Sequence, residues 1–221
     1  MKKLLGVFVL ISILSFGCKT MNKTQKGAVI GTATGAAAGA VIGRVAGNTA
    51  LGAIIGATVG GVTGAIIGHK MDKQAEEMKK SMPDAQVERV GEGIVIEFNN
   101  KILFGFDQSV LTTTSRTNLD KLVAILNKYP DTNIEVQGHT DSKGTTRYNQ
   151  ALSDRRASSV YNYLSGNGTA VSRLTMKGFG ETAPKYDNAT QDGQTQNRRV
   201  EFLVSANEKM KADAAKESAP K

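Results

Sequence analysis

The apolar residues divide the chain into four stretches with different periods. Residues 4–14 form an apolar run that only one Gly and one Ser interrupt. From residue 27 to 68, glycine recurs almost every fourth position among Ala, Val, Ile and Thr. Residues 69–86 are rich in charged side chains, and residues 87–205 alternate short apolar strands with helical periods. The pattern predicts a leader, a glycine-rich segment, a charged connection and a folded domain.

The folded domain is predicted to be an α/β sandwich with helices on one face of a small mixed sheet. One predicted helix covers about 112–129 and another about 147–164, each with one apolar face. The predicted strands are 93–98, 102–106, 133–137, 173–177 and 199–204. About 115 residues is an ordinary size for one domain.

Composition narrows the class of protein. The 221 residues carry 28 Lys and Arg against 20 Asp and Glu, a net charge of +8. Such a charge suits nucleic acid, anionic lipid or an acidic polymer equally well. The sequence lacks the aromatic–basic pattern of nucleic-acid binders, so we expect no nucleic-acid partner. A single cysteine excludes an internal disulfide and a multi-cysteine zinc site, and we expect neither metal nor cofactor.

The N-terminus is typical of a secretion signal. Lys2 and Lys3 precede the apolar run, which is too short for a membrane helix of about 20 residues. Small residues follow, and then Cys18. The arrangement resembles the lipobox of bacterial lipoproteins, except that Ser15 stands where that pattern prefers Leu. The alternatives are an ordinary secretory signal and an uncleaved anchor.

The lipoprotein resemblance implies a signal peptide over 1–17 and acyl lipid, such as palmitate, on Cys18. Residues 18–26 would then be the lipidated N-terminus and linker. Because Lys19 is not acidic, resemblance to lipoprotein sorting rules implies the periplasmic face of the outer membrane.

The glycine repeat predicts a helical hairpin over 27–68. Small residues at every fourth position let helices approach closely. The turn is expected at Gly47-Asn48-Thr49, between helices 27–47 and 50–68 of near-spanning length. The segment resembles the glycine zippers of outer-membrane lipoproteins. A flexible spacer is the alternative. Whether the hairpin spans, lies in one leaflet or self-associates stays open. A charged stalk is predicted over 69–86 and a flexible tail over 206–221.

The candidate site lies on the second predicted helix. Leu152, Arg156, Val160 and Leu164 are four apart and share a face. An arginine on an apolar face requires an anion. Asp141 follows the strand that ends near Gly138, where α/β folds commonly bind ligands. Together the two charges suit a zwitterion, and a buried Asp–Arg salt bridge without a ligand fits the spacing equally well.

Several motifs resemble the OmpA-like peptidoglycan-binding family, over about half the chain. They are Gly138-His139-Thr140-Asp141, Asn149-x-x-Leu152-Ser153-x-x-Arg156-Ala157, Lys177-Gly178-Phe179-Gly180-Glu181 and Asn197-Arg198-Arg199-Val200-Glu201. The resemblance implies that Asp141 and Arg156 contact the diaminopimelate of the wall peptide. It also implies pocket-side positions for Thr140 and Asn149, although Asn149 could merely cap the helix. Arg198 and Arg199 could touch the glycan or the peptide, or could be solvated edge charges, and we expect the second.

The predicted function is a non-catalytic tether between membrane lipid and peptidoglycan. His139 and Asp141 could form an acid–base pair, but no nucleophile accompanies them, and we expect His139 to make a structural hydrogen bond. One alternative is a membrane-active or self-associating glycine-zipper protein anchored to the wall. The other is a wall hydrolase.

Overall fold

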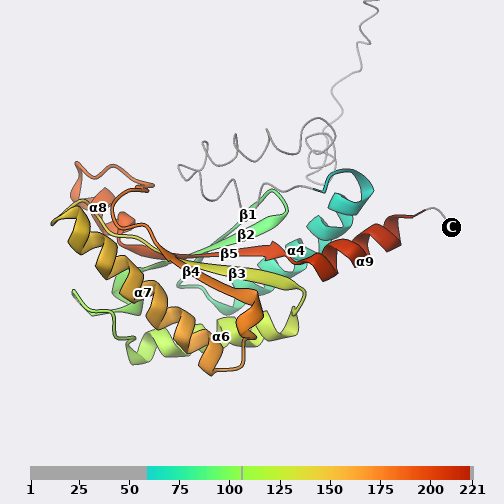
Figure 1. The fold of residues 1–221 in the computed structure, drawn as a ribbon, viewed down its shortest axis with the longest axis horizontal. Coiled ribbons are helices and arrows are strands. Elements are labelled where there is room, and N and C mark those ends of the chain that lie inside the picture. Colours follow the sequence, from blue (N-terminus) through green and yellow to red (C-terminus); the bar gives the residue numbers. More distant parts are fainter. Residues whose placement is uncertain (1–58, 106, 220–221) are drawn as a thin grey trace, which may run out of the picture.

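The computed structural model describes residues 59–105 and 107–219, drawn in colour in Figure 1. The predicted signal peptide, Cys18, the linker and the hairpin up to residue 58 lie outside the described residues. The helices are α4 (Gly61–Ser81), α5 (Asn100–Leu103), α6 (Thr113–Lys128), α7 (Thr146–Gly166), α8 (Gln191–Asn197) and α9 (Glu208–Ser218), with a 3-10 turn at Val171–Arg173. The strands are β1 (Gln86–Val90), β2 (Gly93–Asn99), β3 (Thr132–Gly138), β4 (Leu174–Gly178) and β5 (Arg199–Ala206).

The five strands form one mixed sheet in the order β1-β2-β5-β3-β4. β3 and β4 are parallel and α7 connects them, whereas the other neighbours are antiparallel. Figure 1 shows α6 and α7 together on one side of the sheet. The predicted α/β sandwich is therefore confirmed.

Strand alternation builds the core as the sequence predicts. Ile94, Ile96 and Phe98 of β2 point to the same face and are fully buried. The rings of Phe98 and Phe202 meet edge to face across β2 and β5, with centroids 5.8 Å apart. On α7, the face that carries Leu152 and Val160 packs toward the sheet, so this part of the core follows directly from local periodicity.

The predicted charged stalk is wrong, because residues 69–81 belong to a core helix. α4 begins inside the predicted hairpin and runs through residue 68 without a break. Met71, Ala75 and Met78 are buried in the same cluster as the sheet residues. Charged residues cover the outer face of α4. Because they dominate the composition of this segment, composition alone does not reveal its apolar face.

The second predicted hairpin helix, 50–68, is also wrong as a continuous element. Gly60 and Gly61 both have positive φ, so a right-handed helix cannot continue backwards through them. Gly64 lies where an added Cβ would be 2.6 Å from Glu92 Oε1, in the turn between β1 and β2. Among the described residues, this repeat glycine therefore accommodates the turn between two strands.

Two further predictions differ from the structure. The predicted tail is largely helix α9, and Met210 and Ala214 are buried against the core. Residues 102–106 were predicted as a strand, but α5 ends at Leu103 and Phe104 makes only an isolated bridge to Leu111. Among residues 59–105 and 107–219, no helix is both long and apolar enough to cross a bilayer.

Candidate functional site

The register of β3 against β5 creates the site. The strands are antiparallel and Gly138 pairs with Val200. Residues just after Gly138 therefore run beside residues just before Val200. The amide of His139 donates to the carbonyl oxygen of Arg199 at 3.0 Å and continues the ladder by one step. Asp141 and Arg198 consequently meet beyond the strand ends.

The loop after β3 fixes Asp141. The amide of Thr140 donates to the carbonyl of Gly180 at 2.9 Å, and its hydroxyl donates to the carbonyl of Asp141 at 2.9 Å. One carboxylate oxygen of Asp141 accepts from the amide of Lys143 at 3.1 Å. Asp141 is 6 % exposed. The predicted pocket residue Thr140 is thus engaged with the loop itself.

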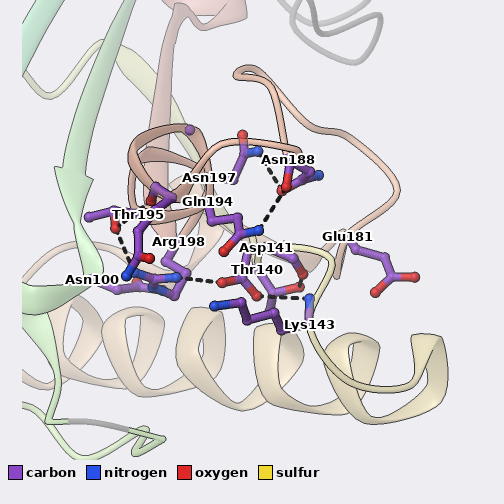
Figure 2. Close-up of polar contacts among 12 residues, drawn as sticks. Asn100, Thr140, Asp141, Lys143, Glu181, Asn188, Gln194, Thr195, Asn197 and Arg198 are labelled. Carbon is purple, nitrogen blue, oxygen red and sulfur yellow. Dashed lines mark hydrogen bonds and ion pairs between the residues drawn. The ribbon is translucent and has the colours of Figure 1, made fainter.

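The other carboxylate oxygen of Asp141 is in an ion pair with Arg198 Nη1, the contact at the centre of Figure 2. Arg198 Nη2 donates to the hydroxyl of Thr195 at 2.8 Å. Arg198 was expected to be a solvated edge charge, whereas it is ion-paired within the site and its side chain is only partly exposed.

Asn149 holds the loop against α7. Its side-chain amide donates to the carbonyls of Asp141 and Lys143, at 3.3 and 3.0 Å, and to the Glu181 carboxylate. The helix cap is Thr145, whose hydroxyl accepts from the amide of Tyr148. The alternative that Asn149 caps the helix is therefore wrong.

Arg156 lies on the same helix, 4 % exposed. Its Nε donates to the carbonyl of Gln108 at 2.9 Å, and its guanidinium lies over the ring of Phe104. Neither terminal nitrogen has a hydrogen-bond partner among residues 59–105 and 107–219. Burial lowers the pKa of Arg156, Asp107 opposes this, and the positive charge of Arg198 lowers the pKa further.

The two residues predicted to bind the ligand, Asp141 and Arg156, do not contact each other in the described structure, and Arg198 interacts with both. Arg198 contacts Asp141 directly, and its charge reaches Arg156. Within the described residues, Asp141 and Arg156 form no salt bridge with each other. The alternative of a ligand-free bridge between these two residues is therefore not what the structure shows. Within residues 59–105 and 107–219, Arg156 is 4 % exposed and is hydrogen-bonded through Nε alone.

His139 does not form an acid–base pair with Asp141. It is fully buried and stacks on Phe179, with centroids 5.2 Å apart and planes nearly parallel. No partner in the described part of the chain meets full hydrogen-bond geometry at either ring nitrogen, and the group that acts on the ring as a backbone hydrogen-bond partner is Ala183. Burial, and then the charge of Arg199, hold the pKa of His139 well below its usual range, while the main chain of Ala183 acts in the opposite direction.

Arg199 is also a buried residue and not a solvated one. Arg199 and Glu201 are both fully buried, with Nε and Oε1 2.6 Å apart. Arg199 also donates to the main chain of Asn197 and Ala183. A signal existed in the sequence, because opposite charges two residues apart on a strand share a face. Arg198 gave no such signal, since its partner lies 57 residues earlier.

Comparison with known proteins agrees with this architecture. The model described as "OmpA family" matches residues 103–198, and "YMGG-like Gly-zipper" matches residues 1–72. Outer-membrane lipoprotein YfiB of Pseudomonas aeruginosa is 36 % identical over 115 residues, which are 52 % of this chain and 68 % of that protein. Peptidoglycan-associated lipoprotein of Haemophilus influenzae is 37 % identical over 101 residues, or 46 % and 66 %.

Other relatives match a similar share of this chain but differ in how much of their own length is covered. Outer membrane porin F of Pseudomonas fluorescens is 46 % identical over 112 residues, which are 51 % of this chain and only 34 % of the porin. The structure of the cell wall anchor of the T6SS from Pseudomonas aeruginosa has a TM-score of 0.54 at 27 % identity, covering 62 % of this chain and 97 % of that one. A MotB-like protein from Desulfovibrio vulgaris shares the fold, with a TM-score of 0.59 at 22 % identity over 64 % of this chain and 94 % of that one.

The fold and the loop–helix site define an OmpA-like domain. The chain belongs to the OmpA family and carries a glycine-zipper segment ahead of the domain. In the described residues, no group of three or more His, Cys, Asp or Glu side chains could hold a metal ion.

Proposed function

We propose that this protein is a non-catalytic tether that joins a membrane to peptidoglycan. Lipid on Cys18 holds the N-terminus to the outer membrane, and the OmpA-like domain binds the free amino-acid centre of diaminopimelate in the periplasm. Two relatives support the location and the partner by name, one an outer-membrane lipoprotein and one a peptidoglycan-associated lipoprotein.

One observation carries the binding proposal. Arg156 is nearly buried, yet both terminal nitrogens lack a partner within the described structure, and only its Nε is bonded. A buried guanidinium with free donors binds a carboxylate in a forked geometry. Asp141, whose loop is bonded to α7 through Asn149, provides the negative charge that a ligand ammonium requires.

The carboxylate of Asp141 has enough acceptor positions for the ligand ammonium to bind without displacing Arg198. An ionised carboxylate has about four acceptor positions. Asp141 uses one for Lys143 and one for Arg198. Thr140 and Asn149, whose donors are bonded within the protein, act in this proposal by holding the loop that presents Asp141.

The decisive experiment is co-sedimentation of the full chain with purified sacculi. Asp141→Asn and Arg156→Gln each remove one charge with little change in volume. We expect each to lower retention at least about tenfold, since a charge-assisted bond contributes roughly 1.5–3 kcal/mol. Retention of both variants at the wild-type level would refute the binding site.

Matched controls are available on the same protein. Arg155→Gln removes an exposed positive charge next to Arg156, and Glu76→Gln removes an exposed negative charge from α4. Both are expected to sediment like the wild type. The membrane end is tested separately, because Cys18→Ser should abolish incorporation of labelled fatty acid and release the chain from the membrane fraction. Cross-linking in membranes then tests self-association through the glycine segment.

A further inference from the structure

Arg198 lies at the junction of two elements that frame the site. It ends α8 and directly precedes β5. Figure 2 shows its guanidinium between Thr195 and Asp141. Its side chain is 30 % exposed, in contrast to the 8 % of Asp141. The residue is therefore held in place and still open to solvent.

Arg198 has donors to spare. A guanidinium carries five N–H groups. The described contacts use one on Nη1, for Asp141, and one on Nη2, for Thr195. The remaining three N–H groups have no partner in the described part of the chain, and on Arg156 the four terminal N–H groups are likewise unbonded.

A second guanidinium, that of Arg156, lies on α7, the helix to which Asn149 bonds the Asp141 loop. The two positive charges repel, and the positive charge of Arg198 contributes to the lowered pKa of Arg156. Asp141 compensates Arg198 directly, while Asp107 acts on Arg156 and accepts a bond from the Tyr148 hydroxyl. A ligand anion beside Asp141 would bind to the donors of Arg198 that its described contacts leave unused.

We propose that Arg198 is a second anion-binding residue, so that the site takes a peptide with a free carboxylate next to the amino-acid centre. The inference rests on the proposed function and adds a requirement on the ligand. The wall stem peptide offers this group, because its glutamate is linked through the γ-carboxyl and keeps its α-carboxylate beside diaminopimelate. Walls in which that carboxylate is amidated are then poorer ligands.

The test pairs a chemical change in the ligand with a change in the protein. Two soluble tripeptides, L-Ala-γ-D-Glu-diaminopimelate and its form amidated at the glutamate α-carboxyl, are titrated into the full chain by calorimetry. For the wild type, amidation is expected to weaken binding about fivefold, as for a partly exposed charged bond. For Arg198→Gln, the same amidation should change binding by less than about twofold.

Charge-matched variants separate a specific contact from general attraction. Arg155→Gln removes a neighbouring exposed charge and should keep the full amidation penalty. Arg198→Lys keeps the charge without the fork and should give an intermediate penalty. It also decides the question if Arg198→Gln fails to fold, which a melting curve would reveal.

Each outcome has a distinct meaning. An equal amidation penalty in the wild type, Arg198→Gln and Arg198→Lys would overturn the role of Arg198 while leaving the tether intact. No amidation penalty in the wild type would overturn it as well. Failure of the wild type to bind either tripeptide would remove the proposed diaminopimelate site and this inference together.

Discussion

The carboxylate of Asp141 is paired with Arg198 and not with Arg156. The antiparallel register of β3 and β5 imposes this pairing, because it brings the end of one strand beside the start of the other. Asp141 is therefore compensated inside the protein. In the part of the chain that the structure describes, Arg156 is nearly buried and is bonded only through Nε, so it is the charge that most needs an external anion.

Close packing of α7 on the sheet should be sensitive at Gly138. A Cβ there would lie 2.3 Å from the backbone carbonyl oxygen of Ser153, so Gly138→Ala must push α7 away from β3. We expect a loss of about 1–3 kcal/mol in unfolding free energy. Sacculus binding should weaken too, since α7 carries Asn149 and Arg156. Urea denaturation and co-sedimentation measure both effects.

Gly166→Ala is the matched control for this helix. Apart from its own helix, no described part of the chain lies within 4 Å of a Cβ added at Gly166, and its φ is not positive. The variant should be neutral or slightly more stable, because Ala is the better helix former. Equal effects at Gly138 and Gly166 would contradict the packing argument.

Buried His139 should make the domain less stable as the pH falls. Its folded pKa lies well below 6.5, whereas in the unfolded chain it titrates near 6.5. Below about pH 6.5 the unfolded state binds a proton that the folded state does not, so stability decreases by up to about 1.4 kcal/mol per pH unit. Above pH 6.5 His139 is neutral in both states, so the folded domain keeps its full stability there.

His139→Phe keeps an aromatic ring on Phe179 and removes the titration. Urea denaturation at pH 7.5, 6.0 and 5.0 should therefore show a smaller loss of unfolding free energy for the variant. The difference should correspond to about one proton fewer taken up on unfolding. The same pH slope in both proteins would show that His139 is not the group responsible.

The buried pair Arg199–Glu201 predicts strongly unequal single and double variants. Arg199→Met leaves the Glu201 carboxylate uncompensated at a fully buried position, which should cost about 3–5 kcal/mol. Arg199→Met with Glu201→Leu removes both charges and should recover most of that loss. Chemical denaturation of the wild type and the two variants tests this, and additive destabilisation in the double variant would be the contrary result.

The C-terminal helix should contribute to the stability of the whole domain. Met210 of α9 is 6 % exposed, and Ser218 is bonded to Thr63 of α4 through their hydroxyls at 2.8 Å. Met210→Ala should lower the unfolding free energy by about 2 kcal/mol. Lys216→Ala, at an exposed position of the same helix, should change it by less than about 0.5 kcal/mol. A melt in which the two variants are equal would place α9 outside the cooperative unit.

The sequence by itself predicted the elements whose periodicity is clean. The alternation in 93–98 became β2, and the four-residue spacing of Leu152, Arg156 and Val160 became the buried face of α7. The position of Asp141 after a strand was equally readable. Local periodicity is sufficient here because a strand or helix must turn its apolar side to the core wherever that core is.

The tertiary structure alone decided which elements meet. α4 and α9 have charged outer faces and were predicted as a stalk and a tail, but Met78 and Met210 show that both complete the core. The partner of Asp141 was likewise invisible, because it depends on strand register across 57 residues. A sequence specifies which side of an element is apolar, whereas its partner is selected by the packing of the whole chain.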